Sequence, residues 1–539
     1  MNPKIDKLLL YARTLIWLKP VQIYGRLWFR LNRPRVRTFR DTALRPCGGR
    51  WRPIARRTSM TGPETFRFLN RTETLGSPDD WNAARLPKLW LYNAHYFDDL
   101  NADDAASRSA WHCDLIARWI AENPPGNGNG WEPYPTSLRL VNWCKWLLSG
   151  NAPVPGMLDS LATQGDGLTK RLEHHLLGNH LFANAKALVF AGCVIDGAEA
   201  ERWRGLGLKL LAREIPEQIL EDGGHFERST MYHAILTEDM LDLVQLADLF
   251  KENLSPKHLN AWQSVSAGML RFLRNLSHPD QRIAFFNDGA FGIAPEPPAL
   301  LAHAAELGIE TAEDPAPVEL HAQTGYARLS KGPAVLLADV APIGPDYLPG
   351  HAHADTLSFE FSLGNQRIFV NGGSSVYGGD PRQRLLERST RYHNTLTIGD
   401  ANSSEIWSDF RVARRARVSD ITHGEDQAIW LQATQDGFRR ISGPRHTRRW
   451  DLTESSLTIR DTLERPHRDA VARFRVHPDL HATTTTLTGA RKIRIETQGA
   501  TLSVEDGTWS PEFGAILPCQ VLTLRLADAT ATITFTWEP

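Results

Sequence analysis

Two histidines in the stretch GHAHADTLSFEF, residues 350 to 361, are the first candidates for chemistry, because only one residue separates them. Read as a β-strand, this stretch places His351, His353 and Asp355 on one face, ahead of an apolar run. Pairing with neighbouring strands would bring further polar side chains within reach, namely Asn371, Tyr377, Arg388 and His393. Imidazoles from two strands can hold a transition metal. The spacing alone fits a metal site, a catalytic site or a strand that begins with histidines.

A second polar cluster lies in HLLGNHLFANAKALVFAG, residues 175 to 192. Gly178 predicts a break in the chain, and Asn179 suits the N-cap position of a helix that His180 would open. Taken alone, the pair is equally well explained by a capping Asn followed by a buried, hydrogen-bonded His.

A third cluster lies in DGGHFERSTMYHAILTED, residues 222 to 239. The glycine pair predicts a bend, so His225, Glu227 and Arg228 are expected on a loop and Tyr232 in the first turn of the next helix. Loop residues at the ends of helices often carry function. The alternative for Tyr232 is an ordinary core position.

The elements that must position these side chains change type along the chain. From about residue 85 to 310, apolar residues recur every three or four positions, as in MYHAILTEDMLDLVQLADLF, which is typical of amphipathic helices. Beyond the Pro- and acid-rich stretch at 309 to 320, short β-branched segments alternate apolar and polar residues. We therefore predict a basic N-terminal extension over 1–60, a helical domain over 61–312 and an antiparallel β domain over 313–539.

The composition excludes several classes of protein. The chain has 539 residues and a formal net charge of −1, so no global basic field points to nucleic acid. Its five cysteines are scattered without any CxxC spacing, which argues against a disulfide framework or a zinc ribbon. No sequence feature indicates an organic cofactor.

The first forty residues carry ten Lys or Arg against one acidic residue, with Trp17, Tyr24, Trp28 and Phe29 interleaved. One interpretation is a basic extension packed across the main domain, and the other is contact with a membrane surface or an anionic polymer. The stretch lacks a clean apolar segment followed by a cleavage site, so we expect neither a signal peptide nor a membrane span. The sequence therefore favours a cytoplasmic protein or one peripheral to the inner membrane.

The segments HLLGNHLFANAKAL, GGHFERS…Y, GHAHAD…SFE and RST…HNTL, in this order and with helices before strands, resemble the heparinase II/III family of polysaccharide lyases, which are alginate lyase- and heparinase-like enzymes. The similarity spans residues 90 to 420. It implies an (α/α) incomplete toroid followed by an antiparallel β-sandwich-like domain, with the active cleft between them. It also implies an anionic polysaccharide substrate and admits a periplasmic location. The oligomeric state stays open.

The resemblance assigns roles to individual residues. Asn179 and His180 would neutralise the carboxylate of a uronic acid. Tyr232 would protonate the leaving oxygen and, as in some members, could also act as base, whereas His351 would act as base or carboxylate neutraliser, so the identity of the base stays open. Further substrate contacts are expected from Asn93, His95, Tyr96, His225, Glu227, Arg228, Tyr377 and Arg388. His353 and His393 match metal ligands for one divalent ion, Zn²⁺ or Mn²⁺, but Asn371 stands where the family has an acidic ligand.

The expected function is therefore β-elimination on a uronate-containing polysaccharide, such as a glycosaminoglycan, alginate or a bacterial exopolysaccharide, which leaves a 4,5-unsaturated uronate end. Two alternatives remain open. The first is a glycoside hydrolase, which would need a pair of carboxylates across the cleft. The second is a non-catalytic polysaccharide-binding or assembly protein that retains the cleft.

Overall fold

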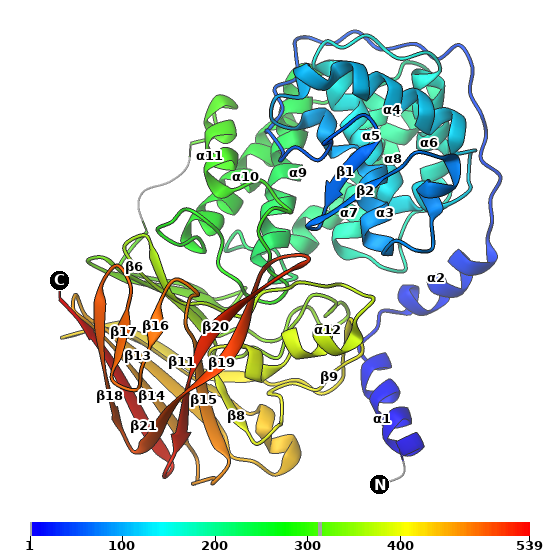
Figure 1. The fold of residues 1–539 in the computed structure, drawn as a ribbon. Helices are drawn as coiled ribbons and strands as arrows, with labels where there is room; N and C mark the ends of the chain where they lie inside the picture. Colours follow the sequence, from blue (N-terminus) through cyan, green and yellow to red (C-terminus); the bar gives the residue numbers. More distant parts are fainter. Residues whose placement is uncertain (1–2, 311–314, 539) are drawn as a thin grey trace.

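The computed structural model describes residues 3–310 and 315–538, and it divides into a helical half and a β half (Figure 1). The helical half is the incomplete (α/α) toroid, in which neighbouring helices such as α7 and α8 or α9 and α10 pack in pairs. Its helices are α3 (Lys88–Tyr96), α4 (Ser109–Glu122), α5 (Pro133–Leu148), α6 (Met157–Thr169), α7 (Gly178–Val194), α8 (Ala198–Gln218), α9 (Thr230–Leu249), α10 (Pro256–Asn275) and α11 (Pro297–Glu306). A short hairpin, β1 (Thr65–Phe68) with β2 (Arg71–Thr74), precedes them.

The β half contains three larger sheets whose named strands all pair antiparallel. The first has the order β3 (Val318–His321), β4 (Tyr326–Lys331), β5 (Ala334–Asp339), β6 (Phe359–Leu363) and β7 (Gln366–Phe369). The second runs β11 (Val418–Glu425), β12 (Ile429–Gln435), β13 (His446–Leu452), β14 (Ser456–Leu463), β21 (Thr530–Trp537), β18 (Lys492–Gln498), β17 (Thr486–Thr488) and β16 (His481–Ala482). The third runs β19 (Ala500–Glu512), β20 (Ala515–Leu526), β15 (Ala470–Arg475) and β8 (Leu396–Ile398). The predicted fold class is confirmed.

Two smaller elements lie beside the junction of the two halves. They are α12 (Pro381–Glu387) and the hairpin of β9 (Ile406–Trp407) with β10 (Arg411–Val412). The predicted domain boundary at 312/313 lies outside the described residues, between the end of α11 and the start of β3.

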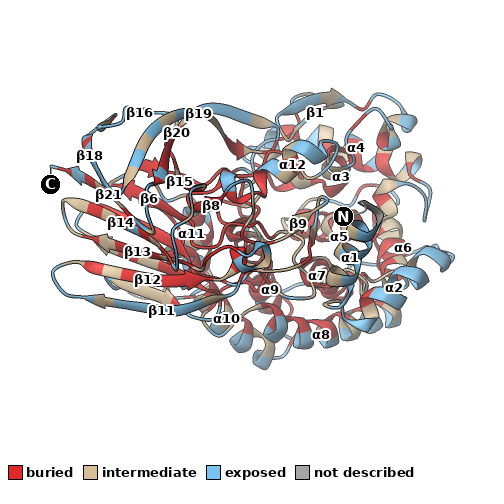
Figure 2. Ribbon diagram, turned by 90° about the horizontal axis from the view of Figure 1, so that it is seen from below, coloured by how far each residue is buried: buried red, intermediate tan, exposed pale blue. Residues whose placement is uncertain are grey.

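The N-terminal segment begins with α1 (Pro3–Leu15) and α2 (Pro20–Leu31), which lie at the periphery of both halves (Figure 1). Figure 2 shows these two helices as mainly exposed or half-buried, in contrast to the buried α7 and α9. Among the described residues, no helix combines the length and the apolar character that a membrane crossing requires.

Buried charges fix the two helices that carry the candidate site. Lys186 of α7 donates to Asp239 of α9 at 2.6 Å and also contacts Asp242, and Lys145 of α5 lies 2.5 Å from Asp242. All four side chains are buried. Removing one partner from such a group leaves an uncompensated buried charge, which is strongly destabilising. The network therefore sets the position of α7 relative to α9.

Two local predictions are wrong. The strand expected over 350 to 361 is irregular until β6 begins at Phe359, and Leu357 has a φ of 62° that no regular strand contains. Asn179 is not the N-cap of α7, because the helix already begins at Gly178 with Leu177 as the cap. By contrast, Tyr232 does lie in the first turn of α9, whose N-cap Ser229 accepts from its backbone N–H.

Candidate active site

His351 lies at the centre of a cluster that draws on both halves of the molecule. Its ring stacks on that of Tyr232 from α9, with centroids 3.8 Å apart and planes 30° apart. Its Nε2 lies 3.5 Å from the Asn179 amide nitrogen of α7 and 3.4 Å from the Glu227 carboxylate. The predicted catalytic residues of the toroid and of the β half are thus brought together, although His351 comes from a loop rather than from a strand.

The Asp288 carboxylate orients His351 through a contact to its Nδ1. One carboxylate oxygen lies 3.0 Å from His351 Nδ1, and the other lies 2.9 Å from His353 Nε2. Arg384 of α12 holds the same carboxylate with two nitrogens, one of them at 2.8 Å. Burial opposes ionisation of Asp288, but the Arg384 guanidinium and both histidines outweigh it and hold its pKa well below the usual range. Asp288 is therefore a fixed negative charge that orients both imidazoles.

Tyr232 is protonated at neutral pH. Burial raises the pKa of its phenol far above the ordinary value, and a hydrogen bond from Tyr377 offsets only part of that rise. The Tyr377 hydroxyl also lies 3.5 Å from His351 Nδ1, so the second predicted tyrosine does reach the site. A phenol that keeps its proton can serve as a proton donor in its resting state.

Asn179 is held by Glu227, which is 2% exposed. The Glu227 carboxylate accepts from the Asn179 backbone N–H at 3.0 Å and from its side-chain amide at 3.1 Å. Gly178 allows this approach with a φ of 54°, because a Cβ atom there would lie 2.6 Å from the Glu227 carboxylate. Glu227, which lies in the loop between α8 and α9, thus fixes the position of Asn179.

His180 is the partly exposed member of the set and lies between two groups that sequence reasoning missed. Its Nδ1 lies 3.1 Å from the Glu173 carboxylate, and its ring packs against that of Tyr134 with centroids 4.5 Å apart. Burial disfavours the charged imidazole, but the Glu173 charge outweighs this effect and raises the pKa of His180 above its ordinary value. A protonated His180 can pair with an anion.

Several predicted substrate contacts turn out to be buried. His225 lies beside Gln218, Arg388 donates to the Ala352 carbonyl, and His95 accepts from the Trp119 indole, and none of the three is more than 1% exposed. Each of these side chains is buried and contacts another part of the protein, so they support the site and do not reach a ligand.

The remaining predicted contacts are only partly available. Asn93 donates to the Leu89 carbonyl within its own helix, and Arg228 donates to the Thr324 and Gln323 carbonyls. Tyr96 is buried at the edge of the site, where its ring meets that of Tyr134 with centroids 6.0 Å apart.

The residues predicted to hold a metal ion do not fit one. His353 Nδ1 and His393 Nε2 lie 3.1 Å apart, but the amide oxygen of Asn371 accepts from the Asn394 N–H and its nitrogen donates to the Phe285 carbonyl. No three His, Cys, Asp or Glu side chains gather as a metal site anywhere in the described part of the chain. Two imidazoles without a carboxylate hold a divalent ion weakly, so no catalytic step is assigned to a metal here.

Chelation provides a test. Dialysis of the purified protein against EDTA should leave its thermal midpoint unchanged, because Asn371, the third predicted ligand, already bonds Asn394 and Phe285. Calorimetry before and after dialysis, together with elemental analysis, measures this. A midpoint that falls and is restored by Zn²⁺ or Mn²⁺ would contradict it, since ions that bind the native state stabilise it.

Four residues of the site were not predicted: Tyr134, Glu173, Asp288 and Arg384. Asp288 lies in FFNDGAFG, a loop whose Asn-Asp-Gly run signals only a turn. The others carry no motif, because their role depends on contacts with residues that are distant in sequence. The one usable signal was the presence of this acidic residue in the loop between α10 and α11.

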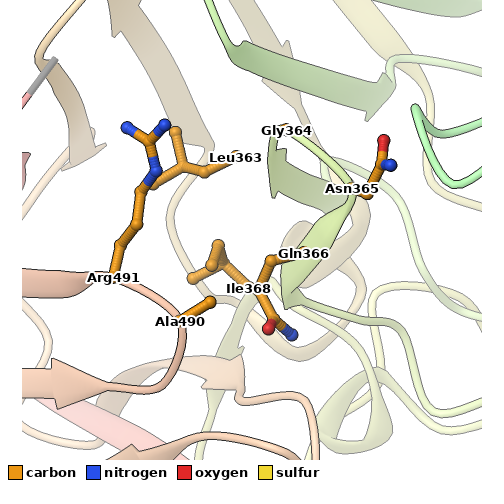
Figure 3. A pocket seen from close by; sticks show the side chains of 7 residues that line it. All are labelled: Leu363, Gly364, Asn365, Gln366, Ile368, Ala490 and Arg491. Carbon is orange, nitrogen blue, oxygen red and sulfur yellow. The ribbon is translucent and has the colours of Figure 1, made fainter.

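A separate pocket of about 390 Å³ lies in the β half (Figure 3). It lies between the β6–β7 turn and the segment that precedes β18, and it is lined by Leu363, Gly364, Asn365, Gln366, Ile368, Ala490 and Arg491. None of these residues belongs to the site around His351.

Comparison with known proteins gives this geometry a context. The model "Heparinase II/III N-terminus" matches residues 110–294, and "Heparinase II/III-like, C-terminal" matches residues 313–538. FtsZ-localized protein C of Caulobacter vibrioides is 27% identical over 75% of this chain and 72% of its own length. A heparin-sulfate lyase of Bacteroides stercoris is 27% identical over 43% of this chain, and the matched region covers 37% of that enzyme.

Solved structures agree on the architecture. The crystal structure of heparinase III superposes with a TM-score of 0.65 at 18% identity, covering 87% of this chain and 79% of that one. A mutant of the heparan sulfate lyase HepC from Pedobacter heparinus superposes with a TM-score of 0.60 at 18% identity, covering 96% and 88%. At such identities the likeness concerns the fold alone. Because the two family models together take in the helical half, the β half and the residues that meet between them, this chain belongs to the heparinase II/III family of polysaccharide lyases.

Proposed function

We propose that this protein cleaves a uronate-containing polysaccharide by β-elimination and leaves a 4,5-unsaturated uronate at the new end. The observation that carries the proposal is the stacking of Tyr232 on His351, with Asn179 beside them. A proton donor, an oriented imidazole and an amide converge there. The heparin-sulfate lyases among its relatives support an anionic polysaccharide as the substrate class.

The first requirement is to make the C5 proton removable. A proton next to a carboxylate is very weakly acidic, so the site must neutralise the carboxylate and hold the charge that develops on it. His180 suits this role because Glu173 favours its protonated form. Asn179 adds an amide whose position Glu227 fixes before the substrate arrives.

The second requirement is a base and an acid. Asp288 binds the Nδ1 side of His351, which leaves Nε2 to accept the C5 proton, as in other His–Asp pairs. Tyr232 then gives its proton to the departing O4 oxygen, and the C4–O4 bond breaks as the C4=C5 double bond forms. The His351 imidazolium and the Tyr232 phenolate exchange a proton through solvent to restore the resting state.

The arrangement favours one stereochemistry. Because the rings of His351 and Tyr232 stack, the base and the acid approach the sugar from the same side. Such a pair suits a uronate in which the C5 proton and O4 lie on one face, as in glucuronate and mannuronate. We therefore propose syn elimination and expect polymers of iduronate or guluronate to be poor substrates.

Hydrolysis is less well supported, because it needs two free carboxylates across the cleft. Three acidic residues of the 222 to 239 segment are candidates for such a pair, and each has a partner in the protein. Asp222 accepts from the Thr324 N–H, Glu227 holds Asn179, and Asp239 pairs with Lys186.

A non-catalytic role is the second alternative, since FtsZ-localized protein C covers more of this chain than the Bacteroides stercoris lyase does. A degenerate site would be expected to lose at least one acid, base or positioning group. Here Asn179, His180, Tyr232 and His351 all keep partners that orient them, which favours catalysis.

Ultraviolet absorbance tests the proposal. The unsaturated uronate is a conjugated product that absorbs in the ultraviolet, whereas hydrolysis produces reducing ends without it. The protein should generate this absorbance on heparosan, hyaluronan or polymannuronate, and far less on dermatan or polyguluronate. Reducing ends without absorbance would support hydrolysis, and no product from the whole panel would support the non-catalytic alternative.

The pH dependence should depend on Glu173. If protonated His180 is required, activity falls as pH rises through its raised pKa. In Glu173→Gln the attraction is lost and burial remains, so the alkaline limb of the kcat/KM profile should move to lower pH. The Glu319→Gln variant, which alters an acid outside the site, is the control. An unmoved limb would mean that His180 acts as a neutral donor.

A further inference from the structure

The N-terminal segment that forms α1, α2 and the turn between them holds most of the large apolar side chains that are exposed in the described chain. Eleven of the eighteen large apolar residues that are exposed lie in this short segment, namely Ile5, Leu8, Leu9, Tyr11, Leu15, Ile16, Ile23, Tyr24, Leu27, Trp28 and Leu31. Contiguous apolar surface of this kind marks an interaction site in a folded protein.

The inward face of α1 is fixed to the β9–β10 hairpin. Tyr11 meets the ring of Trp407 edge-on with centroids 4.9 Å apart, and Thr14 accepts from the Trp407 indole at 3.0 Å. Arg13 lies 3.7 Å from Glu405. These contacts set which side of α1 faces solvent.

The inward face of α2 is fixed to the toroid and to the loop before His351. Gln22 donates to the Tyr347 carbonyl at 3.0 Å, and Lys19 pairs with Glu217 at 2.7 Å. Phe29 packs on His175 with ring centroids 4.2 Å apart. Each helix therefore packs against the protein with one face, and the apolar residues on its opposite face are exposed to solvent.

The exposed apolar residues of α2 follow helical spacing. Ile23, Leu27 and Leu31 lie one turn apart, with Tyr24 and Trp28 beside them. Trp28 is 66% and Leu31 is 80% exposed. This stripe is the apolar side of an amphipathic helix whose partner is missing from the fold.

Positive charge accompanies the stripe. Arg26 and Arg30 lie one turn apart on its flank, and Lys7 lies on α1. None of the three has an ion-pair partner among residues 3–310 and 315–538, and all are exposed. An occupant of this surface must therefore offer negative charge together with an apolar layer.

We propose that α1 and α2 dock on the surface of an anionic lipid bilayer, with the apolar stripe in the acyl boundary and the arginines among the headgroups. Interfacial helices combine these two features, and basic residues near a membrane bind anionic lipid. An anionic polysaccharide would satisfy the arginines but leave Leu27, Trp28 and Leu31 in water. The lipid surface therefore accounts for both observations.

Vesicle sedimentation tests this. The full chain should pellet with vesicles of equimolar phosphatidylcholine and phosphatidylglycerol at low salt, and only weakly with phosphatidylcholine alone. In Leu27→Asn/Trp28→Asn the bound fraction should fall by about tenfold or more, because insertion depends on buried apolar area. The matched control is Ile516→Asn/Leu517→Asn, which removes two exposed apolar side chains of β20 and should bind like the parent.

Three results would overturn the proposal. One is the absence of any vesicle binding, and another is equal binding by the Leu27/Trp28 variant and its control. The third is a dimer in sedimentation velocity that the Leu27/Trp28 variant converts to a monomer, which would assign the face to a second copy. Elimination on a soluble polymer should be unchanged in this variant, so the test stands apart from the proposed activity.

Discussion

Tyr232→Phe is expected to lower the rate of elimination by about 10²–10⁴, the range that a positioned general acid or base contributes. Burial keeps the Tyr232 phenol, which stacks on His351, protonated, so the variant loses the proton that the O4 oxygen takes up. The ring and its stacking on His351 remain. The loss should therefore appear in kcat, measured by the ultraviolet absorbance of the product, with KM little changed.

Tyr24→Phe is the matched control, because it removes an exposed hydroxyl from α2 and should keep the parent rate. Circular dichroism and the thermal midpoint should be the same for both variants. If Tyr232→Phe retains near-parent elimination on a polymer that the parent cleaves, the acid is another group and the proposed mechanism is wrong.

Asp288→Asn is expected to affect both stability and activity. The variant leaves Arg384 buried without its counter-charge, and breaking a buried pair in this way costs about 3–5 kcal/mol. It also frees His351 from the carboxylate that orients it, and a similar change in a His–Asp pair lowers kcat by about 10⁴. Because the folded pKa of Asp288 is depressed, its contribution is present above the ordinary value near 4 and is lost as pH falls through the folded pKa.

Urea denaturation and the elimination rate measure the two effects separately. Asp280→Asn is the control, since that carboxylate also pairs with an arginine, Arg367, but is partly exposed and lies outside the site. Asp280→Asn should lower the free energy of unfolding far less, because partly solvated ion pairs contribute little to stability. Equal losses of unfolding free energy in the two variants would show that the buried Asp288–Arg384 pair contributes no more to stability than a partly exposed pair does.

The order of helices and strands was predictable because periodicity depends on neighbouring residues. The core face of α9 and the position of Tyr232 in its first turn follow from apolar spacing and a serine cap. The 350 to 358 stretch was not predictable, because its course depends on Asn287, which accepts from the His353 N–H across the junction. Burial of Arg388 and His95 was missed for the same reason, since their partners Ala352 and Trp119 are distant in sequence.

The Asp288–Arg384 pair also limits how this protein can evolve. One carboxylate serves two histidines and one arginine, so a single substitution at either end of the pair leaves a charge stranded in the core. Joint replacement by apolar residues would remove that penalty and keep the fold, but it would release His351. A lineage that gives up catalysis should therefore lose Asp288 and Arg384 together, and co-variation of these two positions among relatives would separate lyases from proteins that retain only the scaffold.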